Sequence, residues 1–356
     1  MIKFIFTVIL ISVYSFIYAG QSELSENKSI PLPVYVSALP NINDYNLFSN
    51  GGWDGNWYIG YNTCWIKKLS GIPKGNYRKA FIGAKIGRAK TEPKSGRPIW
   101  EKEHIKGDIY IGISSTPAWR SDQRYYLVSN EDIPLEGDWE NAVEGVGESR
   151  WFWCEVPVNS INFEGANYIA IWSPSEYFIS NASAPILCGG WGTKTEEITT
   201  WLNDEIQGTP PIQPEISLKT QITVFEPALA IKLIPENTEQ ELKVKITGIC
   251  DGKKGTLSKV VFVLIDGIEI ERAWIEAISA SELETDNRWK KITSYLYNPP
   301  YIFTIYPLKM EFPEGKIYIR AVCEDIWSNI GYSAPEEMLI ENQTNISPEK
   351  TKSAGP

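Results

Sequence analysis

Few residues in this chain are suited to acid–base or metal chemistry. Histidine occurs once, as His104 in the run Glu-Lys-Glu-His, whereas multi-histidine zinc sites and Ser-His or Cys-His catalysis need histidine beside further ligands or nucleophiles. Glycoside hydrolysis needs only two carboxylates, about 5 to 10 Å apart. Glu155 is the best single candidate, but no second acid shares its predicted strand face. We therefore expect a protein that is not an enzyme, with glycoside hydrolysis as the less favoured alternative.

Tryptophan offers a different chemistry, because flat aromatic rings stack on the apolar faces of sugars. Eleven of the 14 Trp lie between Trp53 and Trp201. In the predicted strands there, alternation separates an aliphatic face from a face of aromatic, small and polar residues. The aliphatic faces should meet as a core. The aromatic faces should then form a shallow platform, and exposed aromatic patches generally mark binding sites.

The predicted platform has seven members, and its predicted ligand is a polysaccharide or a cell-surface glycan. They are Trp151, Trp153, Glu155, Tyr110, Tyr168, Trp172 and Lys85. An alternative is that loops, an added layer or the neighbouring domain cover these aromatics, since strands buried on both sides are apolar on both faces. In place of a catalytic role, Glu155 would be a hydrogen-bonding rim residue or form an ion pair with Lys85.

Two acidic loops are candidates for a structural calcium site. One contains Asp54 and Asn56, and the other contains Asp132, Glu136 and Asp138. Turn chemistry explains these residues without a metal. No cofactor is therefore expected, and a structural calcium ion stays open.

Short alternating runs between Gly, Pro, Asn and Asp should position these side chains, and this pattern is typical of sandwiches. The fold class expected is all-β, with two β-sandwich domains. Candidate strands include 79–88, 108–114, 124–129, 151–158 and 168–173 in the first domain, and 241–249, 259–265, 268–274 and 316–324 in the second. Residues 138–146 and 194–206 are candidates for short helices.

The domain boundaries follow from composition. Residues 1–19 have a basic start and an apolar run too short to span a bilayer, which is typical of a signal peptide. We expect a polar segment at 20–44, an aromatic sandwich at 45–205, a Pro-rich linker at 206–224, a second sandwich at 225–335 and a disordered tail at 336–356. The mature chain should be secreted or cell-surface, without membrane insertion. A net charge of −10 argues against a nucleic-acid partner.

The second domain contains four landmarks in order: Lys-Val-Val-Phe-Val-Leu-Ile-Asp-Gly at 259–267, Asn-Pro-Pro-Tyr at 298–301, Pro-Glu-Gly at 313–315, and Ile-Arg-Ala-Val-Cys-Glu-Asp at 319–325. On these landmarks, residues 225–335 resemble the bacterial immunoglobulin-like domains of secreted surface proteins. An insertion at 276–297 departs from that pattern and is either a helical excursion or a contact loop. The resemblance implies a spacer, display or adhesion role without catalytic residues.

The same resemblance leads to a disulfide prediction. Alternation puts Val244, Ile246 and Cys250 on one face of an early strand and Cys323 on one face of a late strand, and in an Ig-like sandwich such strand ends meet. A Cys250–Cys323 bond would contribute about 4 kcal/mol. Two buried free thiols are the alternative. Cys64, Cys154 and Cys188 would form one pair and one free thiol, with the pairing open.

The first domain loosely resembles jelly-roll, galactose-binding-like and other carbohydrate-binding modules, without a specific motif. Together these observations favour a secreted protein that binds carbohydrate or mediates adhesion through its first domain, with the second as a spacer. The alternative is a structural surface-layer or envelope component that self-associates or binds other envelope proteins.

Overall fold

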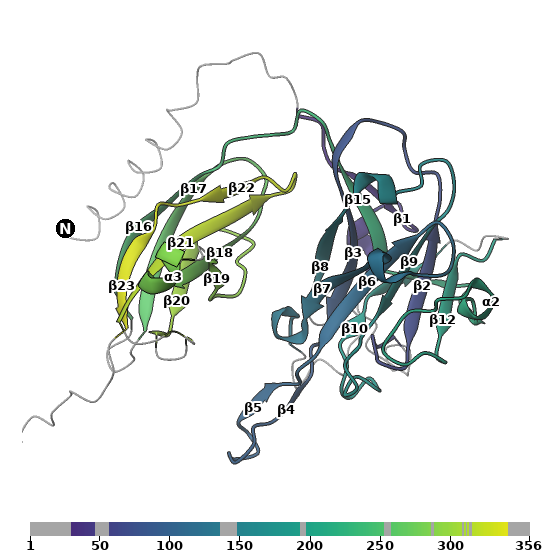
Figure 1. Cartoon of the computed structure of the whole chain (residues 1–356), viewed down its shortest axis with the longest axis horizontal. Helices are drawn as coiled ribbons and strands as arrows, with labels where there is room; N and C mark the ends of the chain where they lie inside the picture. The colour runs from purple at the N-terminus through teal and green to yellow at the C-terminus, as the bar shows by residue number, and fades with distance from the viewer. Residues whose placement is uncertain are drawn as a thin grey trace, which may run out of the picture. The chain divides into compact units, whose positions relative to one another are not determined.

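Alternating apolar side chains form two β-sandwiches in the computed structural model (Figure 1), which confirms the all-β prediction. The structure describes residues 30–46, 57–135, 148–192, 197–252, 258–285, 288–307, 310, 312 and 315–340. The signal-peptide region 1–19 and the last part of the predicted tail lie outside these residues. No helix among the described residues is long and apolar enough to cross a membrane.

The first sandwich consists of two antiparallel sheets. Sheet I contains β1 (Val34–Ser37), β15 (Leu229–Pro235), β3 (Tyr77–Gly87) and β8 (Ser149–Val156) in that order, with β10 (Ile186–Leu187) at the end of β3. Sheet II contains β13 (Thr220–Gln221), β12 (Thr200–Asn203), β2 (Cys64–Leu69), β9 (Asn167–Trp172), β6 (Asp108–Ser114) and β7 (Arg124–Ser129). The strand that spans 200–203 corrects the helix expected at 194–206. The helix expected at 138–146 lies outside the described residues.

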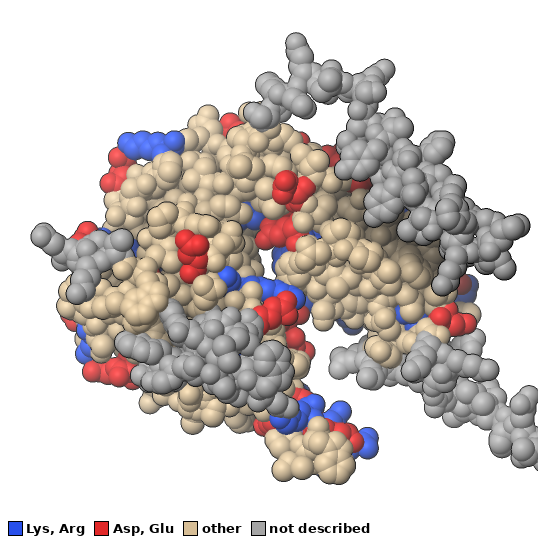
Figure 2. All heavy atoms as spheres, turned by 180° about the vertical axis from the view of Figure 1, so that it is seen from behind, with Lys and Arg blue, Asp and Glu red and all other residues tan. Residues whose placement is uncertain are grey.

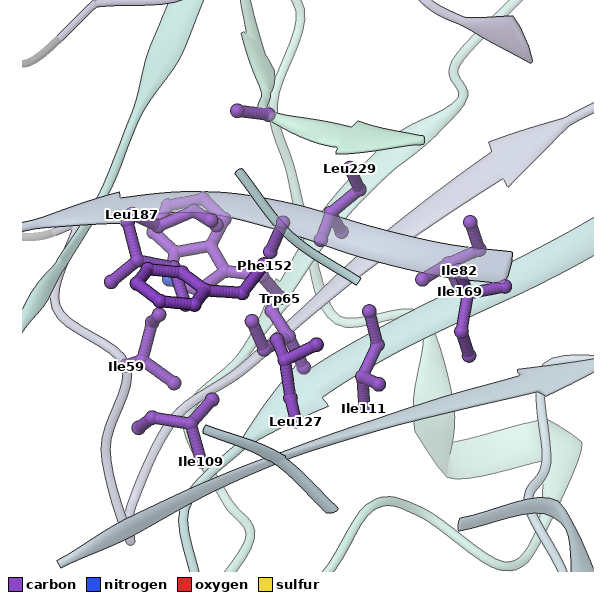
Figure 3. Close-up of a cluster of buried hydrophobic side chains, with 14 of the residues drawn as sticks. Ile59, Trp65, Ile82, Ile109, Ile111, Leu127, Phe152, Ile169, Leu187 and Leu229 are labelled. Atoms are coloured by element: carbon purple, nitrogen blue, oxygen red, sulfur yellow. The ribbon is translucent and has the colours of Figure 1, made fainter. Parts of the chain in front are cut away.

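The core of the first sandwich lies between the inward faces of its two sheets. Ile82 on β3 and Phe152 on β8 meet Ile111 on β6 and Ile169 on β9, and all four are buried (Figure 3). These residues alternate with outward side chains, as period-2 patterning requires. Burying each contributes roughly 1.5–3 kcal/mol. The predicted aliphatic faces are therefore the core faces.

The predicted linker at 206–224 and the polar segment at 20–44 both contribute to the first sandwich. β13 adds an edge to sheet II, β14 (Phe225–Pro227) pairs with β11 (Gly189–Trp191), and the short helix α2 (Pro214–Ser217) precedes both β13 and β14 in sequence. β15 then pairs along β3, and β1 along β15. The first sandwich thus extends to Pro235. The Pro-rich composition reflects a covering loop rather than a boundary, since a loop that covers a sheet needs turns as much as a linker does.

The second sandwich follows from β16 onward. Sheet III contains β16 (Lys243–Asp251), β17 (Lys259–Asp266) and β20 (Tyr301–Ile305). Sheet IV contains β19 (Lys290–Lys291), β18 (Ile270–Ser279), β21 (Gly315–Asp325) and β22 (Ile330–Tyr332), with β23 (Glu336–Ile340) also on β21. β23 occupies residues 336–340 of the tail that was expected to be disordered, and its pairing with β21 corrects that prediction for these residues. The 276–297 insertion contains a short helix, α3 (Ala280–Thr285). Of the two forms expected for this insertion, a helical excursion or a contact loop, the structure thus shows the helical one.

A β-bulge in β16 explains why the predicted Cys250–Cys323 disulfide is absent. Pairing with β17 shifts register between Ile246 and Gly248. The extra residue, Thr247, reverses the alternation, so Ile249 instead of Cys250 packs against the core. Cys250 is exposed, Cys323 is buried, and both are free thiols. Cys64, Cys154 and Cys188 are free as well, which corrects the pair expected among them.

Candidate functional site

The outward face of sheet I carries the best-exposed part of the predicted aromatic platform. Register places Trp153 opposite Gly83, Trp151 opposite Lys85 and Glu155 opposite Phe81 across the β3–β8 pair. Because their neighbours Ile82, Ala84 and Phe152 fill the core, these side chains all point to the other side of the sheet. Sheet I thus brings together four predicted members: Trp151, Trp153, Glu155 and Lys85.

The two tryptophans stack on each other and on the sheet. Their ring centroids lie 5.0 Å apart at an interplanar angle of 13°. A Cβ added at Gly83 would lie 2.3 Å from Cε3 of Trp153, so the absent side chain leaves the space that the indole occupies. The Trp151 Nε1 atom donates a hydrogen bond to the carbonyl oxygen of Ile42, 3.2 Å away. Both rings are half-buried, and their orientation is fixed by these contacts.

Two tyrosines extend the row to either side. The Tyr35 ring centroid lies 5.8 Å from that of Trp153, and Tyr35 is 37% exposed. Tyr45 meets Trp151 edge-on at 5.8 Å and is itself fully buried, so it supports the row from within. We call Tyr35, Trp153, Trp151 and Tyr45 the aromatic row. Sequence reasoning missed Tyr35 because it treated residues 20–44 as a polar segment, and it missed Tyr45 because no strand was predicted around that residue. The alternation in Val34-Tyr35-Val36 was the available signal for β1.

Lysine side chains surround the aromatic row. Lys232 is 1% exposed, lies 3.0 Å from Glu271 Oε2, and places its ammonium 5.7 Å from the Phe81 ring centroid and 5.8 Å from that of Trp153. Lys79 pairs with Glu155 at 3.4 Å. This corrects the ion pair expected between Glu155 and Lys85. Strand register explains the difference, because Lys85 lies opposite Trp151.

Lys85 has a neutral hydrogen-bond partner. Its Nζ donates to the carbonyl oxygen of Tyr45 at 2.6 Å. Among the residues that the structure describes, no carboxylate lies within ion-pair distance of it. Its charge is therefore only partly compensated, beside the face of the aromatic row.

The other predicted aromatics lie on the outward face of sheet II, on the opposite side of the sandwich. Trp172 is 2% exposed and Tyr168 and Tyr110 are half-buried. The buried side chains of Trp119, Trp201 and Ile206 pack against this group. The prediction of a single platform is therefore wrong. Alternation identified which residues point outward, but it could not show that these residues belong to two sheets that face in opposite directions. For this half, the burial alternative holds.

Sheet IV of the second sandwich carries a second group of aromatic side chains that sequence reasoning did not single out. Arg320 lies 4.3 Å from the ring centroids of both Trp289 and Tyr332, and its guanidinium also bonds Glu276 at 2.7 Å. Arg272 repeats the arrangement with Tyr295 at 4.5 Å and Glu324 at 2.6 Å. Each guanidinium is thus paired with a carboxylate within its own sheet. The Trp and Tyr content of the 276–297 insertion was the signal.

A pocket of about 260 Å³ lies apart from the aromatic row. Its lining includes Glu131, Asp132, Glu148, Arg150 and Tyr295. None of the predicted ligand-binding residues lines it. The Asp132 carboxylate is paired with Lys291, and no group of three metal-ligating side chains occurs among the described residues. The other calcium candidates, Asp54, Asn56, Glu136 and Asp138, lie outside those residues.

Comparison with known proteins adds little on function. No protein-family model and no curated protein matches the chain. Similar solved structures include a pectate lyase from Pectobacterium carotovorum (10% identity, TM-score 0.21, 29% of this chain and 28% of that one). The glycoside hydrolase domain of Endo-D from Streptococcus pneumoniae R6 also matches (10% identity, TM-score 0.24, 78% of this chain and 31% of that one). A b-glucuronidase from Ruminococcus gnavus in complex with D-glucuronic acid matches as well (10% identity, TM-score 0.20, 90% of this chain and 48% of that one). The chain spans less than half the length of each.

These matches correct one prediction. All three are enzymes or enzyme domains by name, which contradicts the expectation that the chain is not an enzyme. With TM-scores of 0.19 to 0.24, the matches assign no activity or substrate to this chain.

Proposed function

We propose that the chain binds carbohydrate through the aromatic row on sheet I. The observation that carries the proposal is the stacked Trp151–Trp153 pair, which Gly83 and the Ile42 carbonyl hold in place. Aromatic rings held in this way lose little conformational entropy on binding. Both indoles remain half-buried rather than buried, and the part of each ring that the stacked neighbour leaves exposed is an apolar surface that suits the C–H groups of a sugar ring.

Polar groups at the edge of the row complete the site. Glu155 is 55% exposed and accepts hydrogen bonds, while Lys85 retains ammonium hydrogens beyond the one donated to Tyr45. Sugar hydroxyls need both kinds of partner. A small number of polar groups around an apolar surface is the usual composition of a small-molecule site.

The proposal extends to the rest of the chain. We propose that residues 1–19 direct export and that the second sandwich, as an Ig-like module, acts as a spacer for the first. Supporting the second point, β16, β17 and β20 share one sheet while β18 and β21 share the other, a division compatible with an immunoglobulin-like arrangement.

Trp fluorescence tests the proposal. The full chain is titrated with a panel of soluble polysaccharides while acrylamide quenching is measured, and Trp153→Ala is compared with Trp100→Ala. Trp100 is 77% exposed on the hairpin of β4 (Thr91–Pro93) and β5 (Lys102–His104), outside the site. We expect a glycan to protect the wild type and Trp100→Ala, and Trp153→Ala to lose that protection. Equal protection of both variants, or none by any glycan, would exclude the site.

A second candidate function rests on the outward face of sheet III. Phe262, Leu264 and Ile302 are 38%, 60% and 43% exposed there, and an apolar patch on a monomer often marks an interaction site. The corresponding function is self-association in an envelope layer. Sedimentation velocity of the wild type and Leu264→Glu tests it. Concentration-dependent oligomers that the substitution abolishes would support it, and a monomer at all concentrations would exclude it.

A further inference from the structure

The ionisable side chains on the outward face of sheet I are mostly basic, although the chain as a whole is acidic. Lys79, Lys85 and Lys232 lie there with one acid of the same sheet, Glu155, and with Glu271 of sheet IV, which pairs with Lys232, so one positive charge is left in excess. The chain carries a net charge of −10, and acidic and basic side chains are mixed over the surface in Figure 2. A local excess of one sign beside a binding surface concentrates ligands of the other sign.

From this we infer that the proposed carbohydrate site selects saccharides whose rings carry a carboxylate or a sulfate, with Lys85 as the residue that pairs with the anion. The inference rests on the proposed function and specifies its ligand class. Ring stacking on Trp151 and Trp153 supplies contact area, and the charge near Trp151 supplies the selection.

The three lysines differ in how far protein groups neutralise them. Lys232 is buried and paired with Glu271, so it is not available to a ligand. Lys79 has Glu155 as a carboxylate partner and the Ser328 carbonyl oxygen at 3.4 Å. Lys85 alone of the three has only a carbonyl partner among the described residues. It is therefore the cation with the most to gain from a ligand anion.

The position of Lys85 fits this role. It lies directly opposite Trp151 in the β3–β8 register, and side chains opposite each other across an antiparallel pair start about 4.5–5.5 Å apart at Cβ. A sugar ring against the exposed part of the Trp151 indole would thus place a ring substituent within reach of the ammonium. Its hydrogen bond to the Tyr45 carbonyl oxygen fixes the side chain at the Tyr45 end of the row, which reduces the ordering cost on binding.

The test compares ligands that differ in charge alone. Polygalacturonate and its methyl ester share a backbone, and dextran sulfate and dextran form a second pair that separates sulfate from carboxylate recognition. Affinity of the full chain for all four is measured by calorimetry at low and at physiological salt. We expect at least one anionic polymer to bind about tenfold more tightly than its neutral partner, since a charge-assisted hydrogen bond contributes about 1.5–3 kcal/mol. Salt should reduce that preference.

Variants assign the preference to Lys85. Lys85→Gln should lower affinity for the anionic polymer about tenfold and leave neutral polymers unchanged, Lys85→Arg should retain the preference, and Glu155→Gln should increase it. Lys243→Gln, at an exposed position on β16, is the matched control, and thermal melts verify folding.

The outcomes separate the two proposals. Binding of neutral and anionic polymers with equal affinity, or an anionic preference that survives Lys85→Gln in a folded protein, would overturn the inference and leave the carbohydrate site standing. Absence of binding by any of the polymers, with Trp153→Ala indistinguishable from wild type, would overturn both.

Discussion

Replacing Gly83 with alanine should both destabilise the first sandwich and disrupt the aromatic row. The new Cβ would lie 2.3 Å from Cε3 and 2.7 Å from Cζ3 of Trp153, and 2.6 Å from the carbonyl oxygen of Phe152. Real Cβ contacts are not so short, so either the indole or strand β8 must move. Overpacking of this kind costs about 1–3 kcal/mol, which for a domain of this size lowers Tm by about 2–4 °C per kcal/mol.

Gly248→Ala is the matched control for that experiment. Gly248 is also a strand glycine, but the nearest atom to its added Cβ is Phe262 Cδ2 at 4.0 Å. There, alanine should be neutral or slightly stabilising, because glycine in a strand costs roughly 0.5–1 kcal/mol relative to alanine. Both variants are melted by circular dichroism and their Trp emission is compared. A Gly83→Ala protein as stable as Gly248→Ala, with unchanged Trp emission, would refute the packing described for Trp153.

Three further predictions follow from buried polar groups. Glu226→Gln should lower the free energy of unfolding, measured in urea, by about 3–5 kcal/mol, because it leaves the buried Lys67 unpaired: the Lys67 side chain is 3% exposed and its Nζ lies 2.5 Å from Glu226. The double variant Lys67→Met/Glu226→Leu should recover most of that stability, and failure to do so would contradict the pairing. Iodoacetamide at pH 8 should modify the exposed Cys250 first in the native chain and leave the buried Cys64, Cys188 and Cys323 unmodified. In urea without reductant it should modify all five cysteines, as read by intact mass, and fewer than five would indicate a disulfide. Burial raises the pKa of the Cys188 thiol from 9.0 to about 11. The contribution of this thiol to stability is therefore complete below pH 9 and is lost as pH rises toward 11. Cys188→Ala should flatten that alkaline decline in stability, and an unchanged decline would exclude Cys188 as its source.

Sequence periodicity predicted which residues fill the core, because the two-residue repeat of a strand is local. Ile82, Ile111, Ile169 and Phe152 are all buried where alternation puts them. The same repeat cannot say which sheet a strand joins. Trp153 and Trp172 both point away from the core, yet from different sheets and thus in opposite directions.

Long-range pairing and single-residue irregularities account for the other differences. The central strand β15 is separated from its partner β3 by more than 140 residues, so composition near residue 225 suggested a new domain where the chain returns to the first one. One extra residue at Thr247 reversed the face of Cys250. A slip of one residue moves every later side chain to the other face, and nothing in the local sequence marks it.

The central claim, that the aromatic row binds an anionic saccharide, is tested most directly by calorimetry of the full chain with polygalacturonate and with its methyl ester, followed by the same titrations of Trp153→Ala. Tighter binding of the acid than of the ester, abolished by Trp153→Ala, is the result that we predict. Binding that does not depend on Trp153, or no binding of either polymer or of the dextran pair, would contradict the claim.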